Sequence, residues 1–536
     1  MLSATTKKWA LILAGTLVWS VTMVKSGLVY QYGMGFWGPN GHDGIWHISL
    51  IESLSQGRFD MPIFAGSGIQ NYHIGFDLLL SVIHRLTFIP VITLYFQIIP
   101  PLLALLIGFF TYRLVKLWQN SDSAAWWTIF FVYFGGSWGW ILGKGESTFW
   151  SQQAVSTLIN PPFALSVLLL VVSLICLHQK RFWAAVLVMA LAGQVKVYAG
   201  LLGLVGLFAV AVYELIRHRQ TTYFKIAAGV LLISAVLFFP LNRSSARLIV
   251  FQPFWFLETM MSYSDRVGWT KFYSAMTNYR RAGAWPKAAL AYLVAGAIFV
   301  LGNLGTRILA ALTKPKLDTF FIFFTAVITA GLVIPLFFLQ KGTPWNTIQF
   351  FYYAQFFVSI LAGNALFKIK NLKLKIVVVL LTLPTTWITL RDVYLPSRPP
   401  AKVSPQELQA LRFLRSQPPG IVMTPAVNPD PYAPPPRPLY LYESTAYVSA
   451  LSGQPVFLED EVNLDITGYS WPARRQLVEQ FFRQTDISAA REFVQDHHIT
   501  YIYLPQISHV RPILSSTQLG FVSVYENSQS AIWKKQ

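Results

Sequence analysis

The first polar side chains that suit catalysis follow directly after the first apolar stretch of the chain. The sequence GHDGIWHISLIESLSQGRFDMP occupies residues 41–62. If this segment is helical, Asp43 and His47 are four residues apart and share one face. A carboxylate beside imidazoles suits a general base or a metal ligand. The structural alternative is that Asp43 caps a helix and the histidines lie at the surface. The candidates are His42, Asp43, His47 and Glu52, with His73 a little further on.

Cationic and amide side chains form a second group of candidates. Such cations can neutralise a phosphate, although contact with a lipid headgroup is the simpler role for any one arginine. Amides beside aromatic rings can bind a sugar, or they can cap a helix whose Trp345 anchors the membrane interface. The candidates are Lys196 and Tyr198 in one apolar run, Arg243, Arg247 and Arg266 in the basic loop 241–286, and Asn346 and Gln349 in the segment KGTPWNTIQFFYY.

An acidic group lies near the C-terminal end, in the sequence FLEDEVNLDITG. A solvated acidic loop is the default interpretation, and the alternatives are a cavity mouth or a cation site. The sequence holds no Walker loop, dinucleotide fingerprint or HExxH motif, so neither ATP-driven nor soluble-cofactor chemistry is indicated. The acidic residues are Glu459, Asp460, Glu461 and Asp465.

The composition indicates where these residues must act. Of the 536 residues, 54% are hydrophobic and only 12% are charged, whereas about 25% are charged in a typical soluble chain. Much of the surface therefore faces lipid, and the 18 Trp and 24 Tyr suit the membrane interface. The net charge of +19 comes from short basic clusters between apolar runs. That pattern is typical of cytoplasmic loops and does not indicate nucleic-acid binding.

Apolar segments long enough to cross a membrane recur along the first three quarters of the chain. Spanning the hydrocarbon core takes about 20 helical residues. The first segment is long and lacks a clean cleavage pattern, so we expect a retained helix and not a signal peptide. Eleven helices are predicted, near residues 9–29, 91–112, 124–142, 161–178, 182–195, 199–215, 224–240, 287–304, 319–340, 349–367 and 376–390.

The basic residues predict the orientation of these helices. Lys7 and Lys8 place the N-terminus in the cytoplasm, and further basic clusters fall in alternate loops. The remaining loops and everything after Arg391 are then external. The predicted external loops are 30–90, 143–160, 241–286 and 341–348.

Two segments test this orientation. Residues 74–89 are apolar but contain Asp77 and Arg85, so we expect a helix that lies in the outer interface. Residues 182–215 are too long for one span, and Lys196 lies near their centre. A charge at the bilayer centre costs about 2.5–3.5 kcal/mol or more. A hairpin of two short helices, with Lys196 at the outer turn, avoids that cost.

The chain after the last apolar segment has the pattern of a soluble domain. A proline-rich linker begins at Pro396, and Ser404-Pro405 can start a helix. The helical sequences LQALRFLRSQ and ARRQLVEQFFRQ are interspersed with the strand sequences GIVMTPA, ITYIYLP and FVSVYEN. Alternating helices and strands predict a small α/β domain. We therefore expect a helical membrane domain over residues 1–395 and an extracytoplasmic α/β domain over residues 396–536.

The layout of residues 1–395 resembles the GT-C glycosyltransferases, which include protein mannosyltransferases and lipid A aminoarabinose transferases. The shared features are an inside N-terminal helix, then an external loop with an early acidic residue and interfacial helices. The resemblance implies a donor sugar linked to a polyprenyl phosphate, an essential carboxylate at Asp43, and a donor-phosphate contact at Lys196. Many relatives have Asp-Glu together, whereas here Gly44 follows. Glu52 and Asp60 are the candidates for the second carboxylate.

The function expected from these observations is an inverting glycosyltransferase at the outer face of the cytoplasmic membrane. A base deprotonates the acceptor hydroxyl, and positive charge stabilises the leaving phosphate. Asp43, Lys196 and the segment 341–349 should then converge on one outward-facing cavity. The expected partners are the lipid-linked donor, membrane lipid, and a glycan, lipid or protein acceptor. No cofactor is certain from the sequence, and a divalent cation is the one candidate.

The alternative functions are a transporter or flippase of a lipid-linked glycan, a polymerase or ligase of cell-surface polysaccharide, and a non-enzymatic assembly factor. A transporter should place ionisable or helix-breaking residues near the middle of several membrane helices. In this sequence the polar candidates cluster on one side of the membrane, which favours the transferase.

Overall fold

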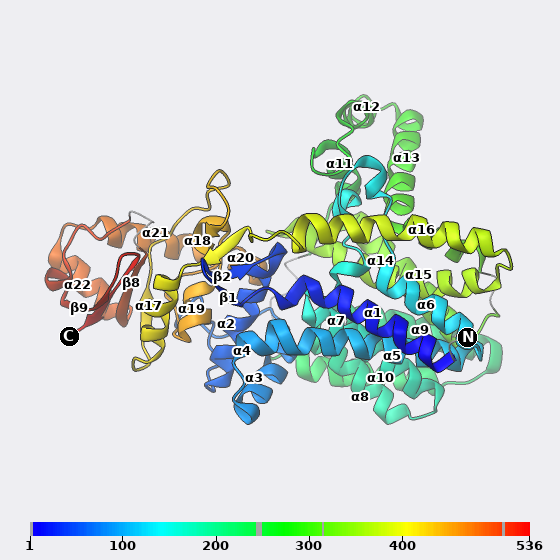
Figure 1. Ribbon diagram of the computed structural model, residues 1–536, viewed down its shortest axis with the longest axis horizontal. Helices are drawn as coiled ribbons and strands as arrows, with labels where there is room; N and C mark the ends of the chain where they lie inside the picture. The colour runs from blue at the N-terminus through cyan, green and yellow to red at the C-terminus, as the bar shows by residue number, and fades with distance from the viewer. Residues whose placement is uncertain (1–3, 243–248, 314–315, 506–509) are drawn as a thin grey trace. The chain divides into compact units, whose positions relative to one another are not determined.

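The computed structural model describes residues 4–242, 249–313, 316–505 and 510–536 (Figure 1). The chain forms two compact units. The helical unit comprises Met1–Thr22, Ile99–Pro240 and Ala246–Leu395, and the mixed unit comprises Met23–Ile98, Leu241–Ser245 and Pro396–Gln536. The predicted domain boundary at residue 395 is therefore one of the points at which the chain passes from the helical unit to the mixed unit. The segment that follows the first helix belongs to the same compact unit as the C-terminal segment.

Each predicted membrane segment contains a helix. Eight helices of the described residues are long and apolar enough to cross a membrane, and α8 and α10 are shorter apolar helices. The predicted number of eleven spans stays a prediction. The helices are α1 (Ala4–Val24), α5 (Ile99–Gln119), α6 (Asp122–Phe134), α7 (Pro161–His178), α8 (Phe182–Val195), α9 (Val197–His218), α10 (Thr222–Phe238), α13 (Trp285–Leu304), α14 (Thr319–Phe337), α15 (Gln349–Lys368) and α16 (Leu372–Thr389).

Helix α6 is shorter than the predicted segment 124–142. It ends at Phe134, and two glycines follow before a short 3-10 turn, Gly139–Leu142. Glycine is a weak helix former, and Gly136 also packs closely on the chain of α16. A Cβ atom at Gly136 would lie 3.0 Å from the carbonyl oxygen of Thr382. Hydropathy alone does not report this end, because the residues after it remain apolar.

The predicted hairpin around Lys196 is confirmed. Lys196 has extended backbone angles, φ −156° and ψ 113°, and separates α8 from α9. The two helices come close at a pair of glycines, since a Cβ atom on Gly200 would lie 2.7 Å from the Cα atom of Gly193. Small residues at such a crossing permit close packing of helices in a membrane.

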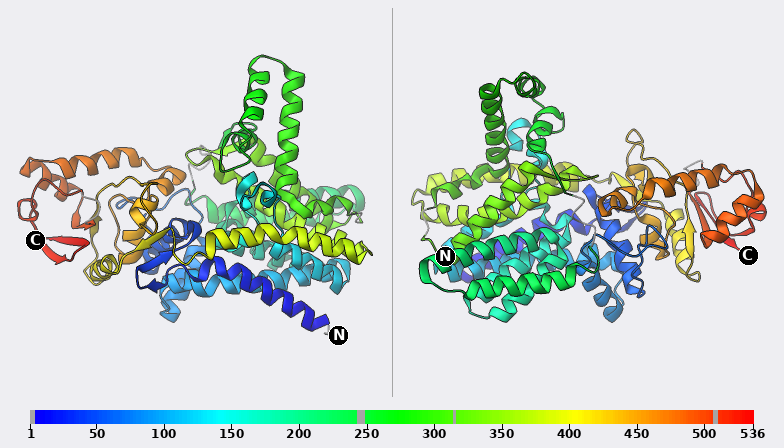
Figure 2. Two further views of the ribbon diagram at one scale, coloured as in Figure 1. Left: turned by 45° about the horizontal axis from the view of Figure 1, so that its top comes forward. Right: turned by 180° about the vertical axis from the view of Figure 1, so that it is seen from behind.

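The predicted loop 241–286 is largely helical. It contains β3 (Ile249–Phe251), α11 (Trp255–Ser262) and α12 (Thr270–Arg281), and β3 pairs with β4 (Phe338–Gln340). Helices α11 and α12 pack beside α13, and this group stands across the direction of α15 and α16 (Figure 1). The same crosswise arrangement is visible from two further sides in Figure 2.

Two four-stranded sheets organise the mixed unit. The first has the order β1-β2-β5-β7, and its antiparallel β2–β5 pair joins the segment after the first helix to the C-terminal segment. The second has the order β6-β8-β10-β9, in which β6 and β8 are parallel. The strands are β1 (Val29–Tyr30), β2 (Gly33–Phe36), β5 (Ala401–Val403), β6 (Ile421–Met423), β7 (Arg437–Pro438), β8 (Ile499–Pro505), β9 (Phe521–Glu526) and β10 (Ser530–Lys535).

Helices accompany these sheets in the mixed unit, and α17, α18, α22 and α23 pack on the strands. The predicted helical sequences of the C-terminal segment lie in α17 and α21, and the predicted strand sequences form β6, β8 and β9. A capping box of Ser404 and Glu407 starts α17. The helices are α2 (Asp43–Ser55), α3 (Gly75–Thr87), α17 (Pro405–Arg415), α18 (Leu439–Tyr442), α19 (Tyr447–Ser452), α20 (Glu461–Thr467), α21 (Trp471–Arg483), α22 (Ile487–Asp496) and α23 (Ser516–Leu519).

Helix α3 matches the helix predicted for residues 74–89. Its 13 residues span about 20 Å at 1.5 Å per residue, which is too short to cross a membrane. Leu78, Leu79, Val82 and Leu86 leave an exposed apolar face on this helix. That face suits a helix lying in the membrane interface, and the interfacial location itself stays a prediction.

Candidate functional site

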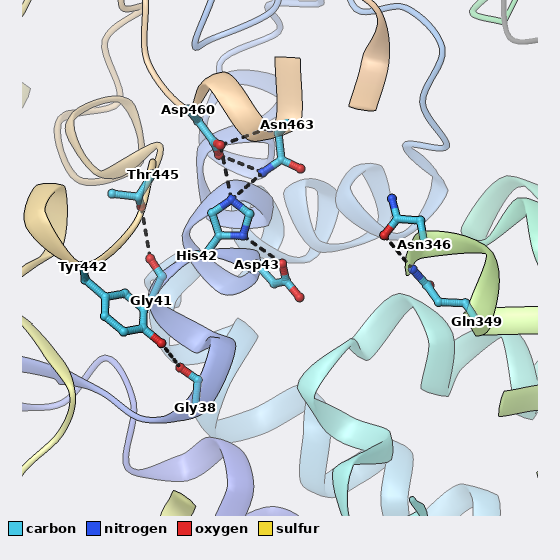
Figure 3. A network of polar contacts seen from close by, with 10 residues as sticks. All are labelled: Gly38, Gly41, His42, Asp43, Asn346, Gln349, Tyr442, Thr445, Asp460 and Asn463. Atoms are coloured by element: carbon cyan, nitrogen blue, oxygen red, sulfur yellow. Dashed lines mark hydrogen bonds and ion pairs between the residues drawn. The ribbon is translucent and has the colours of Figure 1, made fainter. Parts of the chain in front are cut away.

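The turn that precedes Asp43 is held in place by the last residue of α18 and by a residue shortly after that helix. Residues Gly38–Gly41 form a 3-10 turn directly before α2. Tyr442 donates a hydrogen bond from Oη to the carbonyl oxygen of Gly38 (3.2 Å), and Thr445 donates from Oγ1 to that of Gly41 (3.1 Å) (Figure 3). Two residues about 400 positions away in the sequence therefore fix the start of α2.

Asp43 is the first residue of α2 and the most accessible part of that helix. Every residue from Gly44 to Ser55 is buried, whereas the Asp43 side chain is 42% exposed. A carboxylate in the first turn interacts favourably with the helix dipole. The helix thus presents one accessible carboxylate on a rigid, buried support.

Steric crowding explains why glycine follows Asp43 instead of a second acidic residue. A Cβ atom on Gly44 would lie 2.6 Å from Cζ of Phe96, and real Cβ atoms essentially never approach another heavy atom so closely. A glutamate at this position would meet the same ring. The Asp-Glu pair considered from the GT-C resemblance therefore does not fit beside Phe96.

His42 connects Asp43 to a second carboxylate. Its Nδ1 lies 3.1 Å from Asp43 Oδ1, and its Nε2 lies 3.3 Å from Asp460 Oδ1 (Figure 3). Asn463 donates from Nδ2 to the other oxygen of Asp460 (2.8 Å). Burial lowers the pKa of His42, but the charge of Asp460 and the hydrogen bonds to both carboxylates outweigh it and raise the pKa well above 6.5. His42 is then an imidazolium at neutral pH and donates to both carboxylates.

The acidic segment near residue 460 differs from the expected solvated loop. Asp460 is only 2% exposed and Glu459 is also buried. Glu459 accepts hydrogen bonds from the backbone N–H groups of Val448 (2.6 Å) and Ser449 (3.1 Å). Burial raises the pKa of Glu459 to about 8. The sequence singled out this segment by its charge, but 418 positions separate Asp460 from His42, so the pairing itself had no local signal.

His47 and Glu52 each contact a charged side chain from another segment of the mixed unit. His47 is buried, and its Nδ1 lies 2.8 Å from Asp77 Oδ1. Glu52 is buried and accepts a hydrogen bond from Arg415 Nη2 at 2.6 Å. Asp43 and His47 both lie on α2, four residues apart, and His47 contacts Asp77 of α3. These contacts favour structural roles for His47 and Glu52.

The two remaining candidates of this segment lie elsewhere in the mixed unit. His73 stacks on the neighbouring ring of Tyr72, with ring centroids 4.5 Å apart. Asp60 is exposed and forms an isolated β-bridge with Gly68. Neither contact links these residues to the His42–Asp43 group.

In the helical unit, Lys196 lies among polar groups from several helices. Its Nζ donates to Asn160 Oδ1 (3.4 Å), and that amide also caps α7. The ammonium lies 5.7 Å from the ring centroid of Tyr198. Tyr198 donates from Oη to Gln340 (3.4 Å) and packs edge-on against Phe350. The α8–α9 turn therefore lies close to the residues that flank the segment 341–349, and the convergence of both with Asp43 on one cavity stays a prediction.

The other predicted binding residues have local contacts. Gln349 donates from Nε2 to Asn346 Oδ1 at 3.4 Å (Figure 3). Arg266 packs its guanidinium over the Trp150 ring, 4.2 Å from the centroid, and donates to the carbonyl oxygen of Ser147 (2.9 Å). Arg243 and Arg247 lie outside the described residues.

A metal centre has no ready-made ligand set in the part of the chain that the structure describes. No group of three or more His, Cys, Asp or Glu side chains there is arranged to hold an ion. The divalent cation considered from the sequence stays a prediction.

Comparisons with known proteins give a match in structure alone. No protein-family model and no curated protein matches the sequence. Among solved structures, the oligosaccharyltransferase of Archaeoglobus fulgidus, in complex with Zn and sulfate, is 13% identical with a TM-score of 0.50 and covers 92% of this chain and 68% of its own. The arabinofuranosyltransferase AftD from Mycobacteria is 14% identical with a TM-score of 0.51, over 99% of this chain and 40% of AftD. ArnT from Cupriavidus metallidurans is 13% identical with a TM-score of 0.41, and the match covers 99% of this chain and 98% of ArnT.

The structural likeness shows a shared fold. The fold of this chain is like that of the Archaeoglobus fulgidus oligosaccharyltransferase and of AftD, and the helical membrane fold expected from the GT-C resemblance is confirmed. At these identities the likeness carries no assignment of substrate or of catalytic residues.

Proposed function

We propose that this chain is an inverting glycosyltransferase that transfers a sugar from a polyprenyl-phosphate donor to a hydroxyl acceptor. Transfer takes place at the outer face of the cytoplasmic membrane, with the N-terminus in the cytoplasm. The observation that carries the proposal is an accessible carboxylate, Asp43, at the start of a buried helix and beside a buried imidazolium, His42, in a GT-C fold.

The proposed reaction has one displacement step. An Asp43 carboxylate oxygen takes the proton of the acceptor hydroxyl as the acceptor oxygen forms a bond to the anomeric carbon. The bond between the anomeric carbon and the phosphate oxygen breaks, and polyprenyl phosphate leaves with the electron pair. Attack from the face opposite the leaving group inverts the anomeric configuration. A phosphate is a good leaving group, so a cation is needed more than an acid.

His42 and Lys196 have supporting roles in this scheme. His42 donates a hydrogen bond to Asp43 and holds its carboxylate in one orientation, which is a positioning role. Lys196 supplies the positive charge for the leaving phosphate. Its burial beside Asn160 and Tyr198 strengthens this attraction, since a low dielectric weakens the screening.

The direct test is transfer by the purified full-length chain. The chain in proteoliposomes is supplied with a panel of radiolabelled polyprenyl-phosphate sugars and with membrane glycan extracts as acceptors. We expect release of polyprenyl phosphate and a labelled product with one of these donors. Translocation of the donor without any bond cleavage would contradict the proposal and support a flippase.

A variant at Lys196 tests the phosphate role. Lys196→Ala should raise the Kd for the donor by about tenfold or more, as expected when one charge-assisted contact of about 1.5–3 kcal/mol is lost, and leave acceptor binding nearly unchanged. Lys370→Ala, at an exposed lysine, is the matched control. Equal loss of donor and acceptor binding in Lys196→Ala would argue against a phosphate contact.

A further inference from the structure

A cavity lies in the helical unit where two short helix connections meet. One connection joins α7 to α8 and the other joins α9 to α10, and both line the cavity together with the first turns of α14. The cavity has a volume of about 330 Å³, which is within the range of small-molecule sites. It lies at the opposite ends of α8 and α9 from Lys196, so it is separate from the Lys196 turn.

The wall of this cavity changes from polar to apolar with depth. Leu207 lies 11 residues before the end of α9 at His218, which is about 16 Å along the helix. Leu174 and Phe323 lie about one turn inside α7 and α14. A ligand that matches this wall has an apolar part inside and a polar part at the mouth. The polar lining residues, which lie at the helix ends or in the connections, are His178, Lys180, Gln220, Thr222, Tyr223 and Thr319.

Lys180 lies at the mouth of the cavity on a tight turn. Its backbone is left-handed, with φ 58°, and the Arg181 N–H closes the turn by donating to the carbonyl oxygen of Cys176 (2.9 Å). Lys180 is exposed and takes part in none of the ion pairs among the described residues. The imidazole of His178 stacks on the Phe320 ring, with centroids 5.3 Å apart. The mouth therefore presents an ammonium group and an imidazole on fixed supports.

The charge around the mouth is positive. The described segments 174–182, 207–225 and 316–323 contain six lysine or arginine residues but only two carboxylates, Glu214 and Asp318. Glu214 is buried near Tyr223. Asp318 accepts hydrogen bonds from Trp118 Nε1 (2.8 Å) and from the backbone N–H of Phe321 (2.9 Å). Neither carboxylate lines the cavity, so an anionic group is attracted to the mouth.

We propose that this cavity binds one anionic phospholipid, with its headgroup phosphate at Lys180 and His178 and one acyl chain extending inward along Leu207. Helices α7, α9 and α14 are long and apolar enough to cross a membrane, so their ends lie at the depth of the lipid headgroups. The ammonium and the imidazole N–H donate to the phosphate oxygens, and the acyl chain packs against the apolar inner wall. This binding does not depend on the proposed sugar transfer.

The test is lipid binding to the full-length chain in a mild detergent. Native mass spectrometry measures the one-to-one complex with dioleoyl-phosphatidylglycerol or with dioleoyl-phosphatidylcholine, which has the same acyl chains but no net charge. We expect a Kd for phosphatidylglycerol about tenfold below that for phosphatidylcholine, which corresponds to about 1.4 kcal/mol. Glycerol phosphate, which has no acyl chain, should not displace the phosphatidylglycerol.

Two variants test the two ends of the cavity. Lys180→Gln removes the ammonium and should raise the Kd for phosphatidylglycerol by about tenfold. Leu207→Trp fills the inner part and should raise that Kd by a similar factor. The matched controls are Lys373→Gln, at an exposed lysine, and Leu201→Trp, at a residue of α9 that is 48% exposed. Both controls should keep the parent affinity.

Four results with the parent chain would overturn the proposal. These are the absence of a one-to-one complex, equal Kd values for the two phospholipids, displacement by glycerol phosphate, or tighter binding of polyprenyl phosphate that is lost in the same variants. The last result would assign the cavity to the lipid of the transfer reaction. Parent affinity in Lys180→Gln or in folded Leu207→Trp would also overturn the proposal. Melting curves show whether each variant is folded, and Lys180→Gln decides the test if Leu207→Trp does not fold.

Discussion

At the scale of single residues, the candidate site is a row of three charged side chains linked by hydrogen bonds. His42 lies between the carboxylates of Asp43 and Asp460, and Asn463 fixes the far carboxylate. An imidazolium between two carboxylates has two donors for two acceptors, so its orientation is defined. The accessible member of this row is Asp43, and Asp43 is the residue that contacts the substrate in the proposed reaction.

The ion pair of Glu52 and Arg415 gives a prediction about stability. Arg415→Met should lower the melting temperature by several degrees, because it leaves the buried Glu52 carboxylate without its 2.6 Å partner. Sugar transfer per folded molecule should stay within about twofold of the parent value. Loss of a structural ion pair lowers the free energy of unfolding but does not change the activation barrier of the reaction. Arg412→Met, one helical turn earlier on α17, is the control for loss of surface charge.

A different result would restore Glu52 to the catalytic group. If Glu52→Gln retains the parent melting temperature but loses transfer by a hundredfold or more, as a lost general base or acid does, then the carboxylate acts in the reaction and the Arg415 contact is secondary.

At the scale of elements, the start of α2 depends on close packing against Phe96. Gly44→Ala should destabilise the chain by about 1–3 kcal/mol, the usual cost of overpacking a well-packed core, because the new methyl group would lie 2.6 Å from the Phe96 ring. Phe96→Leu in the same chain should recover part of this loss. Melting curves measure both variants.

The matched control for this substitution is Gly68→Ala, where no heavy atom lies within 4 Å of the added Cβ. A Gly44→Ala chain as stable as the parent would contradict the packing argument. The absence of a second acid after Asp43 would then need another explanation.

The buried acids of the mixed unit predict that stability falls as the pH rises. Burial raises the pKa of Glu459 from 4.5 to about 8. Below pH 4.5 the folded and unfolded chains both hold this proton. Between pH 4.5 and about 8 only the unfolded chain releases it, so folding loses about 1.4 kcal/mol per pH unit from this group. His42, whose pKa is raised above 6.5, acts in the same direction above pH 6.5.

The measurement is the melting temperature from pH 5 to pH 8. The parent chain should be more stable at pH 5, and Glu459→Gln should have a flatter profile because it carries no ionisable proton. Glu492→Gln, at an exposed position, should keep the parent profile. Equal slopes for the parent and Glu459→Gln would show that Glu459 does not carry the effect.

The sequence predicted most elements but few of the long-range contacts. Apolar length located the membrane helices, and the cost of burying Lys196 in mid-membrane correctly predicted the α8–α9 hairpin. The early end of α6 and the helices within 241–286 were missed, since both depend on packing and not on hydropathy. Local spacing correctly placed Asp43 and His47 on one helix, but it could not show the contacts of His47 with Asp77 and of His42 with Asp460.

At the scale of the whole molecule, the proposed reaction requires one orientation in the membrane. In the orientation predicted from the basic clusters, the loops 30–90 and 341–348 are outside and residues near Lys370 are inside. In a chain with Cys176→Ser, a membrane-impermeant maleimide should label Gly57→Cys and Lys341→Cys on intact cells. Lys370→Cys should be labelled only after the membrane is opened. All three positions are exposed.

Labelling of Gly57→Cys and Lys341→Cys from opposite faces would contradict the topology. The proposed reaction needs the Asp43 loop and the Lys196 turn on the same external face. It could not take place if the two were separated by the bilayer.

The central claim is that the Asp43 carboxylate is the base for sugar transfer, and the most direct measurement is turnover by Asp43→Asn with the donor that the parent chain uses. An amide keeps the size and can accept a hydrogen bond from His42, but it cannot take the acceptor proton. We predict a loss of turnover of about 10²–10⁴-fold, with the parent melting temperature and donor affinity retained, and parent turnover in the exposed control Asp465→Asn. Turnover by Asp43→Asn within a few-fold of the parent would contradict the claim.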